Sequence, residues 1–220
     1  MPSDGRIQER TSGALAAAVR LVSGLTLISR FAGLARDIVT ARLFGDELLA
    51  SAFRAAYALP NLFRRLFGEG ALSAAFLPEY TQLRRDQPDL ANQLASLTVR
   101  LLTLVTGCLL LVVEAALLLV MLFAPQDPGR SLSIQLMMLM LPMMPMVCIT
   151  AILGGMLQAH GRFGPPAAAP IILNLFQILA GGAFYLGWTG DATRTAYLVG
   201  GAAVLASAVQ VVWSWWALRG

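Results

Sequence analysis

Long apolar runs follow one another along the chain from residue 95 to its C-terminal end. A helix that crosses a bilayer needs about 20 mostly apolar residues. Four runs meet this length, and they predict membrane spans near residues 95–124, 133–158, 166–188 and 195–218. The last three carry no charged residue, and within the first the stretch Leu101–Ala124 is interrupted only by Glu114.

The first 90 residues contain two further apolar runs, near residues 13–37 and 47–67, that carry arginines inside them. A charged side chain in the middle of a bilayer is costly, so such helices usually face protein or a water-filled cavity. We therefore expect both runs to be spans that face protein or a water-filled cavity and not lipid all round. Residues 1–12 are polar and are expected to form a cytoplasmic tail.

The connections between these runs are short and rich in proline, glycine and aspartate, which are typical of turns. Short connections predict antiparallel neighbours, and helices satisfy their own backbone hydrogen bonds in lipid. The fold class expected for residues 13–220 is therefore all-α, a polytopic membrane bundle of about six transmembrane helices. Only 13% of the residues are charged, against roughly a quarter in soluble domains, so a single soluble domain is excluded.

All sixteen basic residues are arginines, and their positions predict the orientation of the chain in the membrane. They lie at the ends of the apolar runs, where they favour the cytoplasmic side, and this placement does not suit nucleic-acid binding. With the N-terminus inside, eight arginines lie in cytoplasmic segments, namely Arg6, Arg10, Arg64, Arg65, Arg84, Arg85, Arg162 and Arg219. Only Arg42, Arg130 and Arg194 lie in opposite loops, with Arg36 near that end of the first span. Both termini are therefore expected in the cytoplasm.

The sequence shows no catalytic, cofactor or metal motif. His160 is the single histidine and lies in a predicted loop. Cys108 and Cys148 lie inside apolar runs, where buried, unreactive thiols are the ordinary case. No nucleotide-binding loop is visible, so we expect a membrane protein that is not an enzyme.

Charge in the first span is the most informative feature. Arg30 and Asp37 are seven residues apart on one helical face, with Gly33 between them and Arg36 about a third of a turn away. One interpretation is a cationic wall that recognises an anionic group through the guanidinium fork. The other is that Arg36 and Asp37 mark the helix end and Arg30 pairs locally. Spacing alone does not decide between them.

A second unusual stretch follows the second span. Pro60 breaks helical hydrogen bonding, and Asn61, Arg64, Arg65 and Glu69 gather polar groups after it. By itself this stretch is better explained as a positively charged anchor at the inner interface.

These stretches resemble the MurJ (MviN) family of lipid II flippases, within the multidrug/oligosaccharidyl-lipid/polysaccharide exporter superfamily. The matching segments are SRFAGLARD at 29–37, ARLFG at 41–45, LPNLFRRLFGEGALSAAFLP at 59–78 and GRFGPPAAAPIILN at 161–174. They are long, they keep the family's order, and they correspond to about the first six of some fourteen spans.

The resemblance implies an N-terminal lobe facing a cationic central cavity in a bacterial cytoplasmic membrane. There the pyrophosphate and sugars of lipid II cross by alternating access while the lipid tail stays in the bilayer. It matches Arg30, Arg36 and Asp37 with cavity residues, Arg64 with an important arginine, and Glu69 with a family acid. It also implies that a C-terminal lobe or a partner chain completes the cavity.

The chain departs from the family at one place in the second span. Where the family typically has Asp-Ala-Phe, this chain has Ser51-Ala52-Phe53, and Arg54 replaces an apolar residue. Glu47, Ser51 and Arg54 lie on one helical face, so we expect Glu47 to substitute partly for the lost acid by pairing with Arg54.

Three functions follow from these observations. The first is lipid II flipping by a larger transporter of which this is the N-terminal part. The second is a membrane scaffold that no longer transports, or that depends on a partner, which Ser51 favours. The third is export of another polyprenyl-linked saccharide or a drug, although arginines suit an anion better than a cationic drug.

Overall fold

The computed structural model describes residues 3–45, 47–63, 65–66, 71–125 and 127–219. Within these ranges the regular structure is helical, and the helices are α1 (Ser3–Leu43), α2 (Glu47–Phe63), α3 (Ala71–Asp86), α4 (Pro88–Phe123), α5 (Pro128–Met140), α6 (Met143–Ala159), α7 (Gly164–Tyr185) and α8 (Ala192–Arg219). The predicted all-α class is confirmed. Helix α1 continues through most of the expected tail at residues 1–12.

Five helical segments of the described chain are long and apolar enough to cross a membrane, namely Ala16–Leu43, Pro88–Phe123, Pro128–Ala159, Gly164–Tyr185 and Ala192–Arg219. They correspond to five of the six predicted spans. The sixth, expected near 47–67, coincides with α2, which has 17 residues and ends at Phe63. Helix α3, which follows it, is amphiphilic and is not predicted by the apolar runs.

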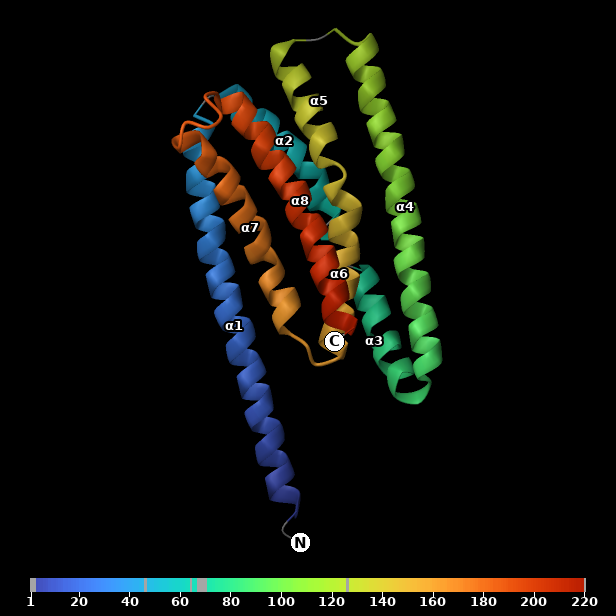
Figure 1. Cartoon of the computed structure of the whole chain (residues 1–220). Coiled ribbons are helices and arrows are strands. Elements are labelled where there is room, and N and C mark those ends of the chain that lie inside the picture. Colours follow the sequence, from blue (N-terminus) through green and yellow to red (C-terminus); the bar gives the residue numbers. More distant parts are fainter. Residues whose placement is uncertain (1–2, 46, 64, 67–70, 126, 220) are drawn as a thin grey trace.

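The chain runs back and forth along the bundle, with α3 continuing in the direction of α2 and α6 in the direction of α5, and α1 begins at the end of the bundle where α8 ends (Figure 1). Helices α5 and α6 form one span in two pieces, broken at Leu141 and Pro142. Proline has no backbone N–H, so Pro142 cannot donate the helical hydrogen bond at this point, which accounts for the break. At the start of α5, the Asp127 carboxylate accepts a hydrogen bond from the Arg130 backbone N–H (2.8 Å) and caps the helix.

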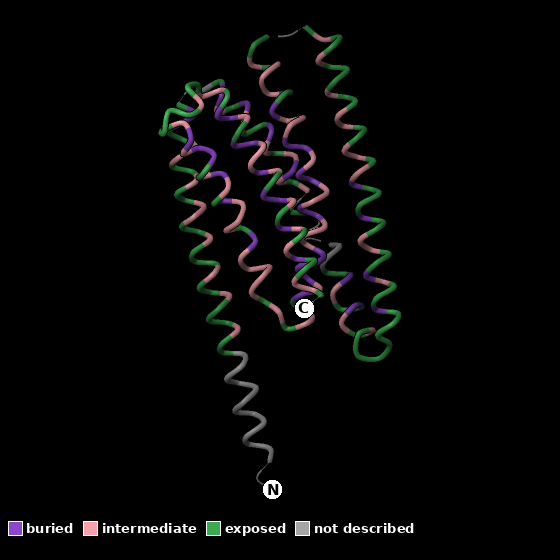
Figure 2. The backbone as a smooth tube through the Cα atoms, viewed as in Figure 1, coloured by how far each residue is buried: buried purple, intermediate pink, exposed green. Residues whose placement is uncertain are grey.

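The core lies where α5, α6 and α8 meet α2 and α7 (Figure 2). Met140, Val199 and Ala203 are fully buried there. Gly200 allows α8 to approach α5 closely, because a side chain at this position would begin 3.3 Å from Met140 Cγ. Packing of this kind, with small residues at the contact, drives association of helices in lipid.

Helix α1 stands apart from this core and packs along α7 (Figure 1). Gly164 and Gly181 of α7 face Leu21 and Val39 of α1, so both ends of the contact are made by glycines. The remaining sides of α1 are exposed to the surroundings of the bundle, and none of residues 16–42 is buried.

Two arginines close the C-terminal ends of other helices. Arg84 at the end of α3 donates a hydrogen bond to the carbonyl oxygen of Ala159, the last residue of α6. Arg162, which precedes α7, donates to the carbonyl oxygen of Ala217 in the last turn of α8. The last four carbonyl groups of a helix lack a partner within it, and a positive charge is favourable beside them.

Candidate functional site

Two adjoining cavities lie between α1, α2, α6 and α7. The smaller, of about 280 Å³, is lined by Arg36, Asp37, Thr40, Phe53, Arg54, Tyr57, Ala58, Asn61 and Gln177. The larger, of about 630 Å³, is lined by residues of α1, α2, α3, α6, α7 and α8, among them Gly33, Thr150, Gln158, Asn174 and Gln210. Arg36, Tyr57 and Asn61 line both cavities, so these three side chains lie at the junction.

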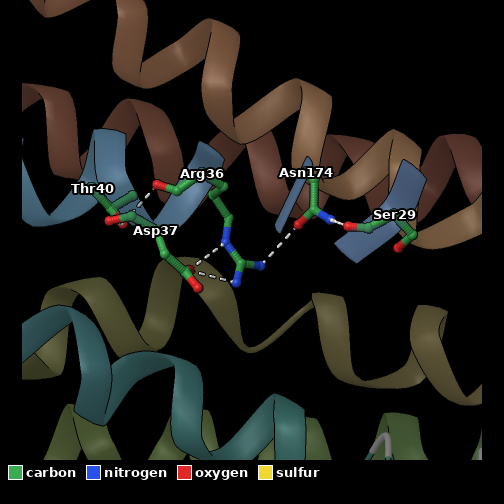
Figure 3. Close-up of polar contacts among 5 residues, drawn as sticks. All are labelled: Ser29, Arg36, Asp37, Thr40 and Asn174. Atoms are coloured by element: carbon green, nitrogen blue, oxygen red, sulfur yellow. Dashed lines mark hydrogen bonds and ion pairs between the residues drawn. The ribbon is translucent and has the colours of Figure 1, made fainter. Parts of the chain in front are cut away.

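The Arg36 side chain donates three hydrogen bonds at this junction (Figure 3). Its Nε and Nη2 donate to one carboxylate oxygen of Asp37 at 3.1 and 2.8 Å, and the second contact is also an ion pair. Its Nη1 donates to the amide oxygen of Asn174 at 3.0 Å. The guanidinium is thereby fixed in orientation between a carboxylate on its own helix and an amide on α7.

Asn174 connects α7 to α1 at two points. Besides accepting from Arg36, it donates from Nδ2 to the backbone carbonyl of Ser29 at 3.2 Å (Figure 3). Gly33 faces this amide, and a Cβ at Gly33 would lie 3.6 Å from Asn174 Nδ2, an ordinary contact distance. Sequence reasoning missed Asn174, although a lone asparagine inside the charge-free run 166–188 is a usable signal for an interhelical hydrogen bond.

Arg54 reaches the smaller cavity from α2. Its Nη2 donates to the hydroxyl oxygen of Ser51 one turn earlier, at 3.2 Å. The expected partner of Arg54 was Glu47; the backbone of Glu47 starts α2, but its side chain lies outside the described residues. The contact that the structure shows is therefore with Ser51, the residue at the position of the family acid.

The other predicted residues fall into two groups. Arg30 and Arg65 are exposed and line neither cavity, so the structure does not bring Arg30 together with Arg36. Pro60 is fully buried, and Asn61 beside it lines both cavities. Arg64 and Glu69 lie outside the described residues.

Two further residues of the smaller cavity were not predicted, Tyr57 and Gln177. The Tyr57 ring stacks on Phe53, with ring centroids 6.2 Å apart. Gln177 is 1% exposed, and its amide oxygen has no hydrogen-bond partner within the described structure. Like Asn174, Gln177 is a polar residue in an otherwise apolar span, and that is the signal that could have indicated it.

This arrangement is suited to binding and not to covalent chemistry. The described lining of the smaller cavity contains two guanidinium groups and one carboxylate, together with amide and hydroxyl groups. Among the described residues there is no group of three histidine, cysteine or carboxylate side chains that could hold a metal ion. Fixed arginines in a partly enclosed space favour an anionic ligand with several oxygen atoms.

Comparison with known proteins identifies the family that this chain matches. The model of the family described as "Lipid II flippase MurJ" matches residues 40–219. A probable lipid II flippase MurJ of Treponema pallidum is 36% identical over 165 residues, covering 73% of this chain and 31% of the relative. The lipid II flippase MurJ of Burkholderia cenocepacia is 34% identical over 169 residues, covering 74% of this chain and 33% of the relative.

A solved structure is similar as well. The chain superimposes on a lipid II flippase MurJ in an inward closed conformation with a TM-score of 0.68 and 25% sequence identity. The match covers 88% of this chain and 41% of that one. The chain thus spans about a third of the length of the curated relatives it matches.

Proposed function

Because this chain belongs to the MurJ family of lipid II flippases, we propose that it supplies the N-terminal lobe of a transporter that moves lipid II across the bacterial cytoplasmic membrane. The observation that carries the proposal is the polar junction around Arg36, where a guanidinium held by Asp37 and Asn174 lies between two cavities. A side chain held in this way fixes the shape of the cavity wall before a head group arrives.

In this proposal the head group enters the cavities while the lipid tail remains in the bilayer. The exposed faces of α1 and α2 are where a second lobe would close the cavity from the other side, supplied by a C-terminal part or a partner chain. Arg30, Arg64, Arg65 and Glu69 are proposed to contribute to the completed cavity, with both chain termini in the cytoplasm. Transport then consists of the two lobes opening alternately toward the two sides.

The test uses the complete gene product that contains this segment, expressed in a bacterium whose own lipid II flippase can be depleted. The wild-type gene is expected to restore growth and cell shape. Arg36→Gln removes charge-assisted hydrogen bonds of about 1.5–3 kcal/mol, which corresponds to a loss of flipping of roughly tenfold or more. Arg20→Gln is the matched control, because Arg20 is an exposed arginine of α1 whose hydrogen bond within the described structure is to the Ala16 carbonyl of its own helix.

Rescue by Arg36→Gln at the wild-type level would overturn the assignment of Arg36. Failure of the wild-type gene, with the protein present in the membrane, would favour the second candidate, a scaffold that no longer transports. The observation that supports this candidate is Ser51, which accepts from Arg54 where the family typically has an acid. Restoring the acid by Ser51→Asp separates the candidates, since only an impaired transporter gains activity from it. Accumulation of a different polyprenyl-linked saccharide in the deletion strain would indicate the exporter alternative.

A further inference from the structure

The two arginines of the smaller cavity differ in how much of their charge remains available. Arg36 is paired with the Asp37 carboxylate at 2.8 Å and bonds Asn174 as well. An anion that approaches Arg36 therefore also meets the negative charge of Asp37, which lines the same cavity. Most of the attraction of Arg36 for an anion is offset before the ligand arrives.

Arg54 is in the opposite situation. Its hydrogen bond within the described structure goes to the neutral hydroxyl of Ser51, and no carboxylate of the described residues lies within ion-pair distance of it. It is exposed and lines the smaller cavity, so its remaining N–H groups can reach a ligand there. Among the described residues Arg54 thus has no ionic partner, and a guanidinium with N–H groups still available is suited to an anion.

Gln177 supplies a second and independent observation in the same cavity. Its side chain is almost completely buried, yet its amide oxygen accepts no hydrogen bond within the described structure. Leaving a buried acceptor unpaired costs free energy, which a ligand N–H or O–H group would recover. A ligand that suits both residues therefore carries an anionic group with a hydrogen-bond donor close by.

We propose that Arg54 and Gln177 form a subsite for a glycosyl diphosphate. Arg54 binds the diphosphate oxygens, and Gln177 accepts a hydrogen bond from a hydroxyl or amide group of the first sugar. Arg36 then acts as a positioning residue that holds α1 against α7 and shapes the cavity wall, while Arg54 provides the charge that attracts the head group. The assignment of this subsite rests on the proposed function, and it identifies Arg54 and Gln177 as the residues that select the substrate.

The first experiment measures binding to the purified 220-residue chain in detergent by native mass spectrometry. The probes are a prenyl diphosphate and the prenyl alcohol of equal chain length. The wild-type chain is expected to bind the diphosphate at least tenfold more tightly. Arg54→Gln should lower that preference about tenfold, and Arg54→Lys should restore part of it. The charge-neutral double variant Arg36→Gln/Asp37→Asn should lower it less than threefold.

The second experiment adds a prenyl diphosphate that carries N-acetylglucosamine. Gln177→Leu should weaken binding of this glycosylated probe several-fold and leave binding of the bare diphosphate unchanged, which a general loss of folding could not do. Circular dichroism spectra and melting curves of each variant verify that the helices are intact. The control is again Arg20→Gln, expected to bind like wild type.

The proposal is overturned if Arg54→Gln binds the diphosphate as wild type does, or if the double variant at Arg36 and Asp37 loses more than Arg54→Gln. It is also overturned if the wild-type chain does not distinguish the diphosphate from the alcohol. None of these results bears on whether the complete gene product restores growth to a flippase-depleted cell. Failure of the subsite and failure of the proposed function are therefore distinguishable.

Discussion

Helices α1 and α8 both pack against α7, from its two sides, yet they differ in almost every other respect. Helix α8 has nine buried residues along its length and no charged residue between Thr195 and Leu218. Helix α1 has none buried between residues 16 and 42, and it carries Arg20, Arg30, Arg36 and Asp37 (Figure 2). The helix that forms the core carries no charge along its buried length, whereas the helix that bears the site contributes little to the core.

This difference has a physical cause and a functional result. In lipid, helices associate through close packing and hydrogen bonds, because the tails are as apolar as the side chains. Helix α8 uses close packing on three neighbours, α5, α6 and α7. Helix α1 has one extensive neighbour and holds it through glycine contacts and the bonds of Asn174. Its other faces therefore remain exposed, and in the proposed function they meet the ligand and a second lobe.

The largest effect is expected in the core that α8 shares with α5. Met140 is fully buried against Gly200, and Met140→Ala would leave a cavity that the bundle cannot close without moving α8. The expected loss of unfolding free energy is about 2–5 kcal/mol, measured by denaturation in mixed micelles. Leu27→Ala on α1, where the side chain is 56% exposed, should cost less than about 0.5 kcal/mol. Equal losses would contradict the contrast between core and site helix.

An intermediate effect is expected where α7 separates α1 from α8. A Cβ at Gly181 would lie 2.7 Å from Val39 of α1 and 3.9 Å from Val199 of α8. Gly181→Val should therefore cost about 1–3 kcal/mol of unfolding free energy by overpacking, and protease sites in α1 should become accessible first. The neighbouring Gly182→Val is a close control, because a side chain there meets no atom within 4 Å. A Gly182→Val protein as unstable as Gly181→Val would show that helix propensity, and not the contact, is responsible.

The smallest effect is expected from the polar contact between α1 and α7. Asn174→Ala removes the acceptor of Arg36 and the donor to Ser29. Interhelical hydrogen bonds in membrane proteins average about 0.6 kcal/mol each, so the loss should be near 1 kcal/mol, detectable by the same denaturation experiment. Leu175→Ala, at a half-exposed position one residue further, should change stability less. If Asn174→Ala is silent, α1 is held by its glycine contacts alone.

Much of the fold could be predicted from the sequence because length and apolarity alone define a membrane span. The runs near 95–124 and 195–218 appear as α4 and α8 with little adjustment. Helix α3 could not be predicted in this way, because its charged residues keep its mean hydropathy too low to stand out as an apolar run. The break in the span 133–158 falls at Pro142, which was visible, although which of two prolines interrupts the helix depends on packing.

The site was predicted less completely, for a geometric reason. Polar and apolar residues occur on all sides of α1, so its sequence does not indicate which side faces α7. Spacing alone grouped Arg30 with Asp37, whereas the structure places Arg36 with Asp37 and leaves Arg30 exposed. The partner of Arg36 is Asn174, 138 residues away, and no local pattern contains that pairing.

The two arginines that cap the C-terminal ends of α6 and α8 also bear on how the helices are inserted into the membrane during synthesis. Arg84 precedes α6 in the chain, and Arg162 precedes α8. In the proposed orientation each charge first keeps its own loop in the cytoplasm while the ribosome is still making the helix that it will later cap. In that orientation the terminal carbonyl groups of α6 and α8 lie on the same side of the membrane as Arg84 and Arg162, which were inserted earlier.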